Sequence, residues 1–476
     1  MSELTVLPAS RLAAMVRNKS VSPVELVQAH LRRIERLNPS LNAFVTVDAE
    51  RALDAARAAE QTSCRGVEGG PLHGVPVTIK SSIDVAGLRT ETGTRLRAGR
   101  IATEDAPLVA RLKKAGAIVL GNTNAPELLM AYETDNLLFG RTNNPWDRDR
   151  TAGGSSGGES AAIAAGLSAG GVGSDGGGSI RVPAHFTGIC GLKPTPGRVP
   201  STGHFPSSVG PFALIGVVGP MARTVADVRL LFEVMAGPDH GDTSSAPVSV
   251  CHPDASELKS AVIGYFEDDG RTPITPETRV AVRMAVQALE RAGFATRPFR
   301  PSVLERARDL WWVMFGLAGG YILRPMIAGH EHEISPILRE FVDFVATDPP
   351  LTVARLMDAW IGRDELRLRL LAEMRDVPVF VCPTCSIPAF RHGEREWTID
   401  GVTSRYLRDP DVMTYTQWFN LLGNPAMVVP AGRSPEGLPI GVQVVGRPYE
   451  EELVLAVAAE IERELGGYQP PPMEAL

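Results

Sequence analysis

Two clusters of glycine and serine hold the hydroxyl groups best suited to chemistry in this sequence. The first cluster is residues 153–158 (GGSSGG) and the second is residues 176–179 (GGGS). Glycine lets a backbone approach a ligand closely and leaves N–H groups free as donors. Each cluster therefore presents a serine hydroxyl among backbone amides, the arrangement that acyl transfer requires of a nucleophile beside an oxyanion hole.

Other interpretations of this segment fit less well. A flexible linker would not enclose the Ala-rich residues 159–167, which predict a short helix. Residues 171–176 match the dinucleotide fingerprint G-x-G-x-x-G, but no helix start follows them. Residues 153–157 match the nucleophile elbow G-x-S-x-G, but residues 143–150 before them predict a loop rather than a strand. A phosphate loop would need Gly-Lys-Ser or Gly-Lys-Thr, which follows neither cluster.

The segment 152–195 resembles, almost continuously, the signature of the amidase signature family, serine hydrolases with a Ser-cisSer-Lys triad. The resemblance implies that Ser179 is the nucleophile and Ser155 the bridging serine, after a cis peptide bond. It also implies a lysine at the end of an upstream strand. Lys80 ends the segment 74–80 (GVPVTIK), whose alternating apolar residues predict a strand. The chain looks most like free-standing bacterial amidases of the fatty-acid-amide-hydrolase and aryl-acylamidase type.

The resemblance also implies a mechanism. Lys80 must be neutral to accept a proton from Ser155, which in turn takes one from Ser179. The ordinary pKa of lysine is about 10.4, so burial has to lower it. The N–H groups of the second cluster are the expected oxyanion donors, and they belong to Gly176, Gly177, Gly178 and Ser179.

Other residues of the signature are expected to support this site. Asp175 and Arg181 should hold the glycine loop by charge-assisted hydrogen bonds, and Ser156 should stand beside the relay. A lysine-based triad needs no histidine, so we expect His185 to be packed or hydrogen-bonded. Family members often carry a larger residue at the position of Gly176 or Gly177. The three glycines here keep the donors, but they put the rigidity of the loop in question.

The elements that must position these groups follow the pattern strand, helix, strand over residues 74–80, 107–115 and 117–121. In a parallel sheet, catalytic groups belong at the carboxyl ends of strands, where Lys80 falls. With the resemblance, this pattern predicts a large single-domain α/β fold: a mixed, mainly parallel central sheet with helices on both faces. Ser22 and Glu25 form a capping box, which predicts a helix to about Leu37.

The whole chain, residues 1–476, is expected to form one amidase domain, in which four segments can be distinguished. They are amino-terminal helices (1–60), the signature core (61–236), a variable helical region over the substrate pocket (237–376) and the carboxy-terminal part of the core (377–476).

Apolar and aromatic residues after the buried strand, together with those of the variable region, are expected to line the substrate pocket. The candidates are Met130, Tyr132, Trp311, Trp312 and Phe315. Such a pocket favours amides and anilides with apolar or aromatic groups, and we extend the expectation to carbamates (urethanes) and esters. Two alternatives remain open: the glutaminase (A) subunit of a tRNA-dependent amidotransferase, and a non-catalytic binding homologue. The second would be expected to lose Lys80, Ser155 or Ser179, and all three are present.

The amino-acid composition and net charge disfavour several other classes of function. The 476 residues carry a net charge of −7, which disfavours nucleic acid or an anionic membrane as a partner. Five cysteines are few and odd in number, which indicates a reduced, cytoplasmic protein. No signal peptide or transmembrane segment is expected. We expect neither cofactor nor metal, because the pair Cys382 and Cys385 has no second pair of ligands. We expect a small-molecule amide or carbamate substrate as the partner, and a monomer or homodimer.

Overall fold

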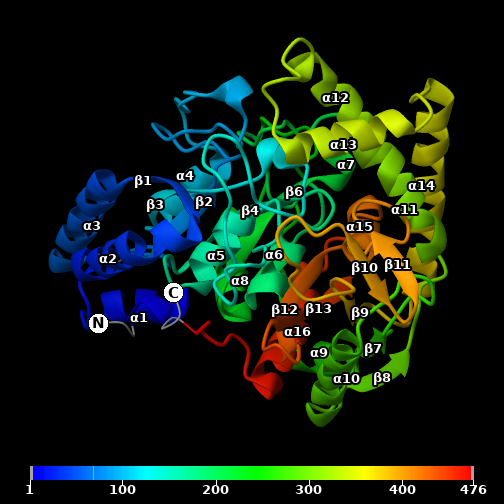
Figure 1. Cartoon of the computed structure of the whole chain (residues 1–476). Helices are drawn as coiled ribbons and strands as arrows, with labels where there is room; N and C mark the ends of the chain where they lie inside the picture. The colour runs from blue at the N-terminus through cyan, green and yellow to red at the C-terminus, as the bar shows by residue number, and fades with distance from the viewer. Residues whose placement is uncertain (1–3, 68, 473–476) are drawn as a thin grey trace.

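The computed structural model describes residues 4–67 and 69–472. In these residues one sheet has eleven strands, in the order β1-β3-β2-β4-β6-β5-β12-β13-β9-β7-β8, and β10 and β11 form a separate pair (Figure 1). The strands are β1 Phe44–Val47, β2 Pro76–Lys80, β3 Ile118–Thr123, β4 Gly170–Asp175, β5 Cys190–Lys193, β6 Val217–Ala222, β7 Val262–Tyr265, β8 Ala295–Pro298, β9 Val379–Pro383, β10 Glu396–Ile399, β11 Val402–Arg405, β12 Ala426–Arg433 and β13 Pro439–Gly446.

Sixteen α-helices accompany these strands in the described residues. They are α1 Ala9–Arg17, α2 Pro23–Leu41, α3 Ala49–Cys64, α4 Pro107–Lys114, α5 Gly157–Ala164, α6 Arg181–Thr187, α7 Phe212–Ile215, α8 Val225–Met235, α9 Ala255–Ser260, α10 Pro276–Arg291, α11 Leu304–Trp312, α12 Ala318–Ile327, α13 Pro336–Thr347, α14 Val353–Glu373, α15 Thr414–Leu421 and α16 Glu451–Leu465. The predicted capping box of Ser22 and Glu25 is formed and begins α2.

The predicted fold class, a large single α/β domain with a mixed sheet between helices, is confirmed. Parallel pairing occurs in two blocks, β3-β2-β4 and β9-β7-β8. The middle of the sheet, from β4 through β6, β5, β12 and β13 to β9, pairs antiparallel, as does β1 with β3. Antiparallel pairs are thus more numerous than the alternation of strand and helix over residues 74–121 suggested. Strands joined by short turns, such as β12 and β13, need no crossover helix and can pair antiparallel.

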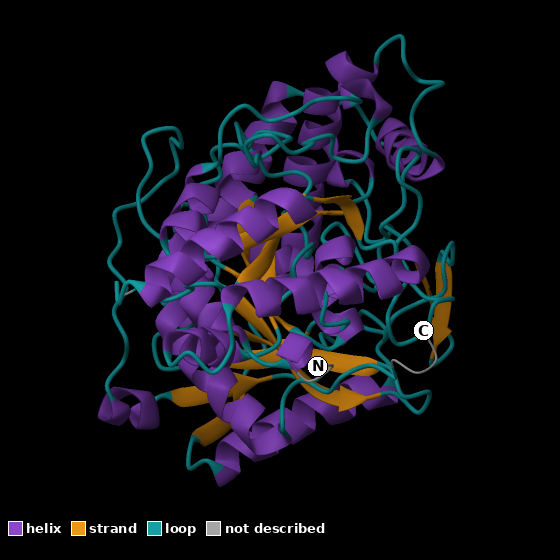
Figure 2. Ribbon diagram, turned by 90° about the vertical axis from the view of Figure 1, so that its left-hand side faces the viewer, coloured by secondary structure: helices purple, strands orange, loops and turns teal. Residues whose placement is uncertain are grey.

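Helices cover both faces of the sheet (Figure 2). Neighbouring residues of β12 show this, because side chains alternate between the faces of a strand. Val429 belongs to the core under α8, α10 and α16, whereas Val428 packs with α5 and α6 on the other side.

The parallel block β3-β2-β4 sets the position of the site. β2 pairs in parallel with both β3 and β4, so the three strands end at the same edge of the sheet. Their last residues are Thr123, Lys80 and Asp175. β2 therefore places Lys80, its last residue, beside the loop that follows β4, as the strand pattern predicts.

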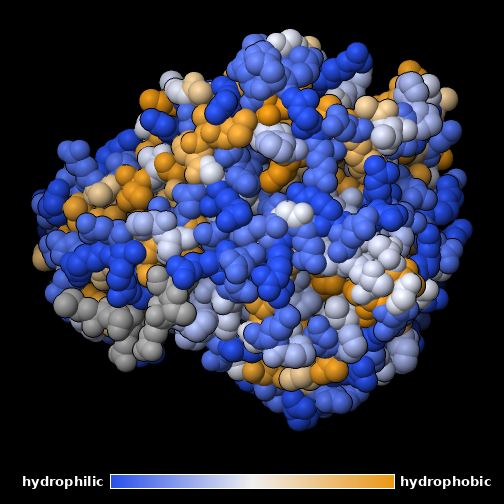
Figure 3. Space-filling view, viewed as in Figure 1, coloured by the Kyte–Doolittle hydropathy of each residue, from blue (hydrophilic) through white to orange (hydrophobic). Residues whose placement is uncertain are grey.

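The face seen in Figure 3 is mostly hydrophilic, with apolar side chains in small separate groups. Residues Leu304–Ile327 form one continuous helical stretch (α11, a π-helical segment η4 at Val313–Leu317, and α12) that is long and apolar enough to cross a membrane by length and composition. Its apolar window is 56% buried inside the protein, and a core helix passes the same test.

Candidate active site

Lys80 lies at the centre of a group of serine hydroxyls. Its side chain has no exposed surface, and its Nζ lies 2.7 Å from Ser155 Oγ, 3.0 Å from Ser156 Oγ and 3.0 Å from Ser174 Oγ. Burial lowers the pKa of Lys80 well below its usual range, although Asp175 and the carboxyl of Glu159 oppose the shift. A buried lysine that faces only hydroxyls is thus biased toward the neutral form, which can accept a proton.

Glu159 is buried beside this group, on the first turns of α5. It accepts hydrogen bonds from the hydroxyls of Thr78 and Thr123, the latter at 2.7 Å. Burial raises its pKa to about 7, against the effect of these bonds and of Lys80. Gly171 is required opposite, since a Cβ there would stand 2.0 Å from Glu159 Oε1.

Ser155 and Ser156 lie in a tightly packed loop that leads into α5. The Gly154–Ser155 peptide bond is cis. A Cβ on Gly154 would lie 2.5 Å from the carbonyl oxygen of Ala131, and one on Gly158 would lie 2.4 Å from the backbone N of Asn124. These close backbone contacts require glycine at both places.

Ser179 stands at the end of the glycine loop that follows β4. It is 9% exposed, and its hydroxyl makes no hydrogen bond to the described part of the chain. Ser155, Ser174 and Ser179 line one cavity of about 60 Å³. The structure thus brings all three sequence-predicted members of the triad, Lys80 included, to one edge of the sheet.

The glycine loop offers fewer oxyanion donors than the sequence predicts. The N–H of Gly178 donates a 2.7 Å hydrogen bond to Asp175 Oδ1, so the prediction that it binds the oxyanion is wrong. φ of Gly178 is +129°, a backbone conformation that favours glycine at this turn. The N–H groups of Gly176, Gly177 and Ser179 have no partner among the residues described and remain available.

Asp175 and Arg181 form a buried ion pair of 3.0 Å under the loop. Arg181 also reaches Asn420 Oδ1 at 2.5 Å and Gln443 Oε1 at 3.1 Å. Burial alone would raise the pKa of Asp175, but Arg181, Lys193 and Asn420 outweigh it and hold the value at about 2. Asp175 is therefore ionised at any ordinary pH and stabilises the turn from strand to loop.

Two adjoining cavities meet at Ser179. The first contains the serines, and the second, of about 20 Å³, is more aromatic. Met130 and Phe315 line both, and Tyr132 and Trp311 line the second. Four of the five predicted pocket residues therefore face the nucleophile, in walls that are mainly apolar with a few polar groups.

Trp312 is the fifth candidate, and the prediction that it lines the pocket is wrong. Its ring packs on Phe344 at 4.6 Å, and its Nε1 donates to Asp348 Oδ2 at 2.5 Å. Adjacent residues of a helix point about 100° apart. Trp311 on the same turn of α11 therefore faces the glycine loop, while Trp312 faces α13.

The sequence analysis missed His204 and Ser174. His204 lines the first cavity with the serines, and its Nδ1 lies 2.9 Å from Pro206 O. Burial and the charge of Lys80 lower its pKa to about 4. His185, by contrast, is packed as predicted, with ring nitrogens 2.9 and 3.0 Å from backbone carbonyl oxygens. The alternation of β4 could have indicated Ser174, but no local pattern marks His204.

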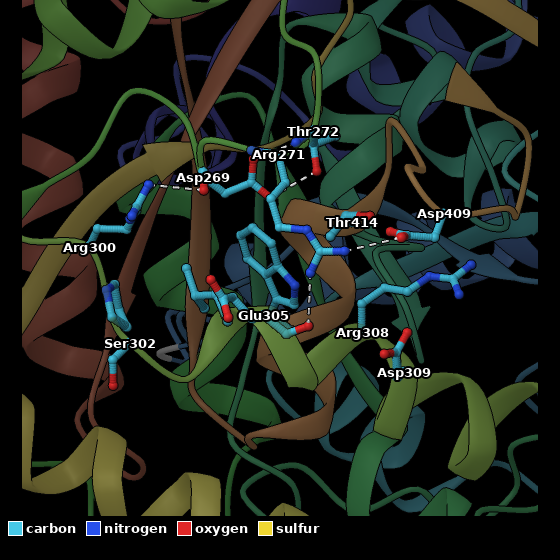
Figure 4. A pocket seen from close by; sticks show the side chains of 13 residues that line it. Asp269, Arg271, Thr272, Arg300, Ser302, Glu305, Arg308, Asp309, Asp409 and Thr414 are labelled. Carbon is cyan, nitrogen blue, oxygen red and sulfur yellow. Dashed lines mark hydrogen bonds and ion pairs between the residues drawn. The ribbon is translucent and has the colours of Figure 1, made fainter. Parts of the chain in front are cut away.

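A further cavity of about 60 Å³ lies apart from these serines, between α11 and the loops before α10 and α15 (Figure 4). One ion pair lies across it, and other arginines there bind backbone carbonyl oxygens. Arg271 pairs with Asp409 at 3.2 Å, and Arg300 donates to Asp269 O at 3.0 Å. No serine of the Lys80 group lines it. Its lining carries charges of both signs, four acidic and three basic residues.

The comparisons with known proteins agree with this geometry. A model of the amidase family matches residues 25–455. The chain belongs to the amidase family. It is 37% identical to an acylamidase from Rhodococcus erythropolis, over 96% of this chain and 95% of that one. It is 34% identical to a glutamyl-tRNA(Gln) amidotransferase subunit from Carboxydothermus hydrogenoformans, over 97% and 98%. The solved structure of a bacterial aryl acylamidase superposes with a TM-score of 0.85 at 27% identity, covering 96% of each chain.

The predicted family and enzyme class are thereby confirmed: this amidase is a hydrolase that acts on C–N bonds of amides. The similarity to acylamidases agrees with the branch that the sequence resembles.

Proposed function

We propose that this amidase hydrolyses aryl amides and anilides with apolar groups through an acyl-enzyme on Ser179. One observation carries the proposal. The buried Lys80 lies 2.7 Å from Ser155 Oγ, and Ser155 lines a mainly apolar cavity together with the otherwise unbonded hydroxyl of Ser179.

In the proposed reaction Ser179 Oγ attacks the carbonyl carbon. Its proton passes to Ser155 Oγ while the proton of Ser155 passes to neutral Lys80 Nζ. The free N–H groups beside Ser179 stabilise the negative oxygen. The C–N bond then breaks, and the proton returns through Ser155 to the leaving nitrogen. Water attacks the acyl-enzyme by the same relay and releases the acid. The hydrogen bond from Ser179 to Ser155 has to close when substrate binds, as is common for catalytic contacts that are loose in the free enzyme.

The same relay only has to protonate the leaving atom, so we include aryl carbamates (urethanes) and esters among the proposed substrates. The walls around Ser179, with Met130, Tyr132, Trp311 and Phe315, favour an aromatic or apolar group on either side of the carbonyl. Methionine allows loose fitting, which suits several leaving groups.

The test is to locate the acyl-enzyme. Wild-type protein is incubated with an activated aryl carbamate and digested, and the modified peptide is identified by mass spectrometry. The label is expected on Ser179, with a Ser179→Ala variant that is folded, unlabelled and inactive. Ser207→Ala, a nearby exposed serine that does not line the cavity, is the matched control and keeps the label. A label on Ser155 or Ser156 would overturn the assignment.

The glutaminase subunit of an amidotransferase is the second candidate, and the amidotransferase relative, 34% identical, keeps it open. Against it, the cavity beside Ser179 is mainly apolar. Of the buried acids, Asp175 lines this cavity but is paired with Arg181, and Asp411 accepts a 2.8 Å hydrogen bond from Gln417 and does not line the cavities at Ser179. A non-catalytic role is the least supported, because the three relay residues stand together.

A further inference from the structure

The carbonyl oxygens of the glycine loop accept hydrogen bonds from residues elsewhere in the chain. Three peptide groups of this loop carry the free N–H groups of Gly176, Gly177 and Ser179. The carbonyl oxygen of each of these groups has a partner: Asn420 Nδ2 lies 3.1 Å from Asp175 O, Trp311 Nε1 lies 2.9 Å from Gly176 O, and Val182 N lies 2.7 Å from Gly178 O.

A trans peptide group is planar, and its C=O and N–H point in opposite directions. A donor that fixes the oxygen therefore fixes the direction of the N–H on the other side. Trp311, by holding the oxygen of Gly176, aims the N–H of Gly177 away from its own indole nitrogen. Trp311 thus acts on an oxyanion donor through the backbone.

The next peptide group is held at both ends. The hydroxyl of Tyr132 donates to Gly177 O at 2.8 Å, and Thr416 Oγ1 lies 2.7 Å from the same oxygen. The N–H of this group is the one bound to Asp175. Tyr132 is itself oriented, since Gln417 Nε2 donates to its hydroxyl at 3.1 Å. Gly177 therefore lies between two fixed peptide groups.

The same aromatic residues occupy the space that a side chain would take on the loop. A Cβ on Gly177 would stand 2.5 Å from the Trp311 ring, and one on Gly176 would stand 2.9 Å from Phe315. The rings of Trp311 and Phe315 are stacked at 4.8 Å. The three glycines, which alone would leave a flexible loop, are thus braced by side chains from a different part of the chain.

We propose that Trp311 is a positioning residue of the oxyanion hole, in addition to lining the substrate cavity. The inference rests on the proposed function of Ser179. It links specificity to rate, because the group that a substrate packs against is also the group that aims an oxyanion donor.

The test compares Trp311→Phe, which keeps an aromatic ring but removes the N–H donor and one ring of the indole, with Tyr132→Phe, which removes only the O–H donor. The control is Phe315→Leu, which changes the same cavities and removes no hydrogen bond. Hydrolysis of 4-nitroacetanilide gives kcat and KM. Phenylboronic acid, which adds to Ser179 and mimics the tetrahedral intermediate, is compared by its Kd with benzyl alcohol, which occupies the cavity without forming an adduct.

Tyr132 holds the peptide group whose N–H is bound to Asp175, so Tyr132→Phe should lower kcat less. Loss of a whole oxyanion donor costs about 10²- to 10³-fold in kcat, so the misdirected donor in Trp311→Phe is expected to cost about 10-fold. KM should change little, and phenylboronic acid should bind about 10-fold more weakly while benzyl alcohol binds as before. Phe315→Leu should act mainly on KM and leave the ratio of the two Kd values unchanged.

A loss confined to KM in Trp311→Phe, or an equal loss of affinity for the two probes, would overturn the positioning role. This failure differs from that of the proposed function, in which Ser179→Ala would remain active or Ser179 would stay unlabelled.

Discussion

The Nζ of Lys80 lies 2.7 Å from the hydroxyl oxygen of Ser155 in a place where Lys80 has no exposed surface. The contact joins the last residue of β2 to a loop about seventy-five positions later in the chain. Burial also lowers the pKa of Lys80, so the proposed base is both held against Ser155 and biased toward its neutral form.

The first prediction concerns pH. The rate of anilide hydrolysis should fall as pH drops through the lowered pKa of Lys80, because a protonated lysine cannot accept a proton. Lys80→Met should lose about 10²- to 10⁴-fold in kcat, the usual contribution of a general base. Both are measured by steady-state kinetics with 4-nitroacetanilide.

The sequence alone offered no histidine that could replace Lys80, but the structure places His204 in the same cavity. His204→Gln is therefore the control, and it should keep the acid limb of the pH–rate profile. A limb that disappears in this variant, or a wild-type rate that stays flat down to about pH 5, where unperturbed lysine and histidine are both protonated, would contradict the assignment.

A second prediction concerns Glu159. Its carboxylate raises the pKa of Lys80, so Glu159→Gln should lower that pKa further and move the acid limb of kcat to lower pH. Glutamine can still bond to Thr78 and Thr123. Glu365→Gln, an exposed carboxylate on α14, is the matched control and should leave the limb in place. Movement of the limb to higher pH would refute the electrostatic link.

The third prediction concerns stability. Asp175→Asn removes one charge of a fully buried pair and leaves Arg181 without its partner. Breaking such a pair costs about 3–5 kcal/mol of unfolding free energy, measured by guanidinium chloride denaturation at pH 7. Asp309→Asn, an exposed acid with no partner in the described structure, should change it by less than about 0.5 kcal/mol.

The sign of the pH dependence follows from the lowered pKa of Asp175. The folded value of about 2 lies below the ordinary 3.8, so the stabilisation is fully present above pH 3.8 and is lost as pH falls toward 2. The difference between wild type and Asp175→Asn should therefore be constant at neutral pH and shrink only in strong acid. An equal difference at pH 7 and pH 2 would exclude an electrostatic origin.

Much of the site follows from sequence because its chemistry is local. Glycine and serine types in fixed order mark the two loops, and period-two alternation places Lys80 at a strand end. The conformation inside a loop is not local. That Gly178 turns its N–H to Asp175, and that His204 reaches the serines, depends on tertiary contacts that no spacing reveals.

The direction of side chains on α11 also depends on tertiary contacts and could not be predicted from the sequence. Trp311 and Trp312 are chemically identical neighbours, and only the rotation of α11 against the glycine loop decides which lines the cavity. The sequence analysis did not predict that the central strands of the sheet pair antiparallel, for a related reason. Only residues 74–121 show strand, helix and strand in alternation, and strands such as β5 and β6 carry no sequence sign of their direction.

The last prediction concerns substrate choice. Ser179 opens onto two cavities whose walls include Met130, Tyr132, Trp311 and Phe315, with no unpaired charge of either sign among the described residues that line them. Glutamine carries an ammonium and a carboxylate, and an apolar wall would remove water from both without replacing it. An aryl anilide is instead expected to bury its ring against Phe315 and Trp311, and burial of a phenyl group contributes about 1.5–3 kcal/mol to binding.

We therefore expect kcat/KM for 4-nitroacetanilide to exceed that for glutamine by at least about tenfold, since 1.4 kcal/mol corresponds to a factor of ten. Phe315→Ala should narrow this ratio by raising KM for the anilide alone. The measurement uses the purified chain without added protein, with release of nitroaniline and of ammonia followed in parallel. A higher kcat/KM for glutamine would reverse the interpretation and favour the glutaminase role in an amidotransferase.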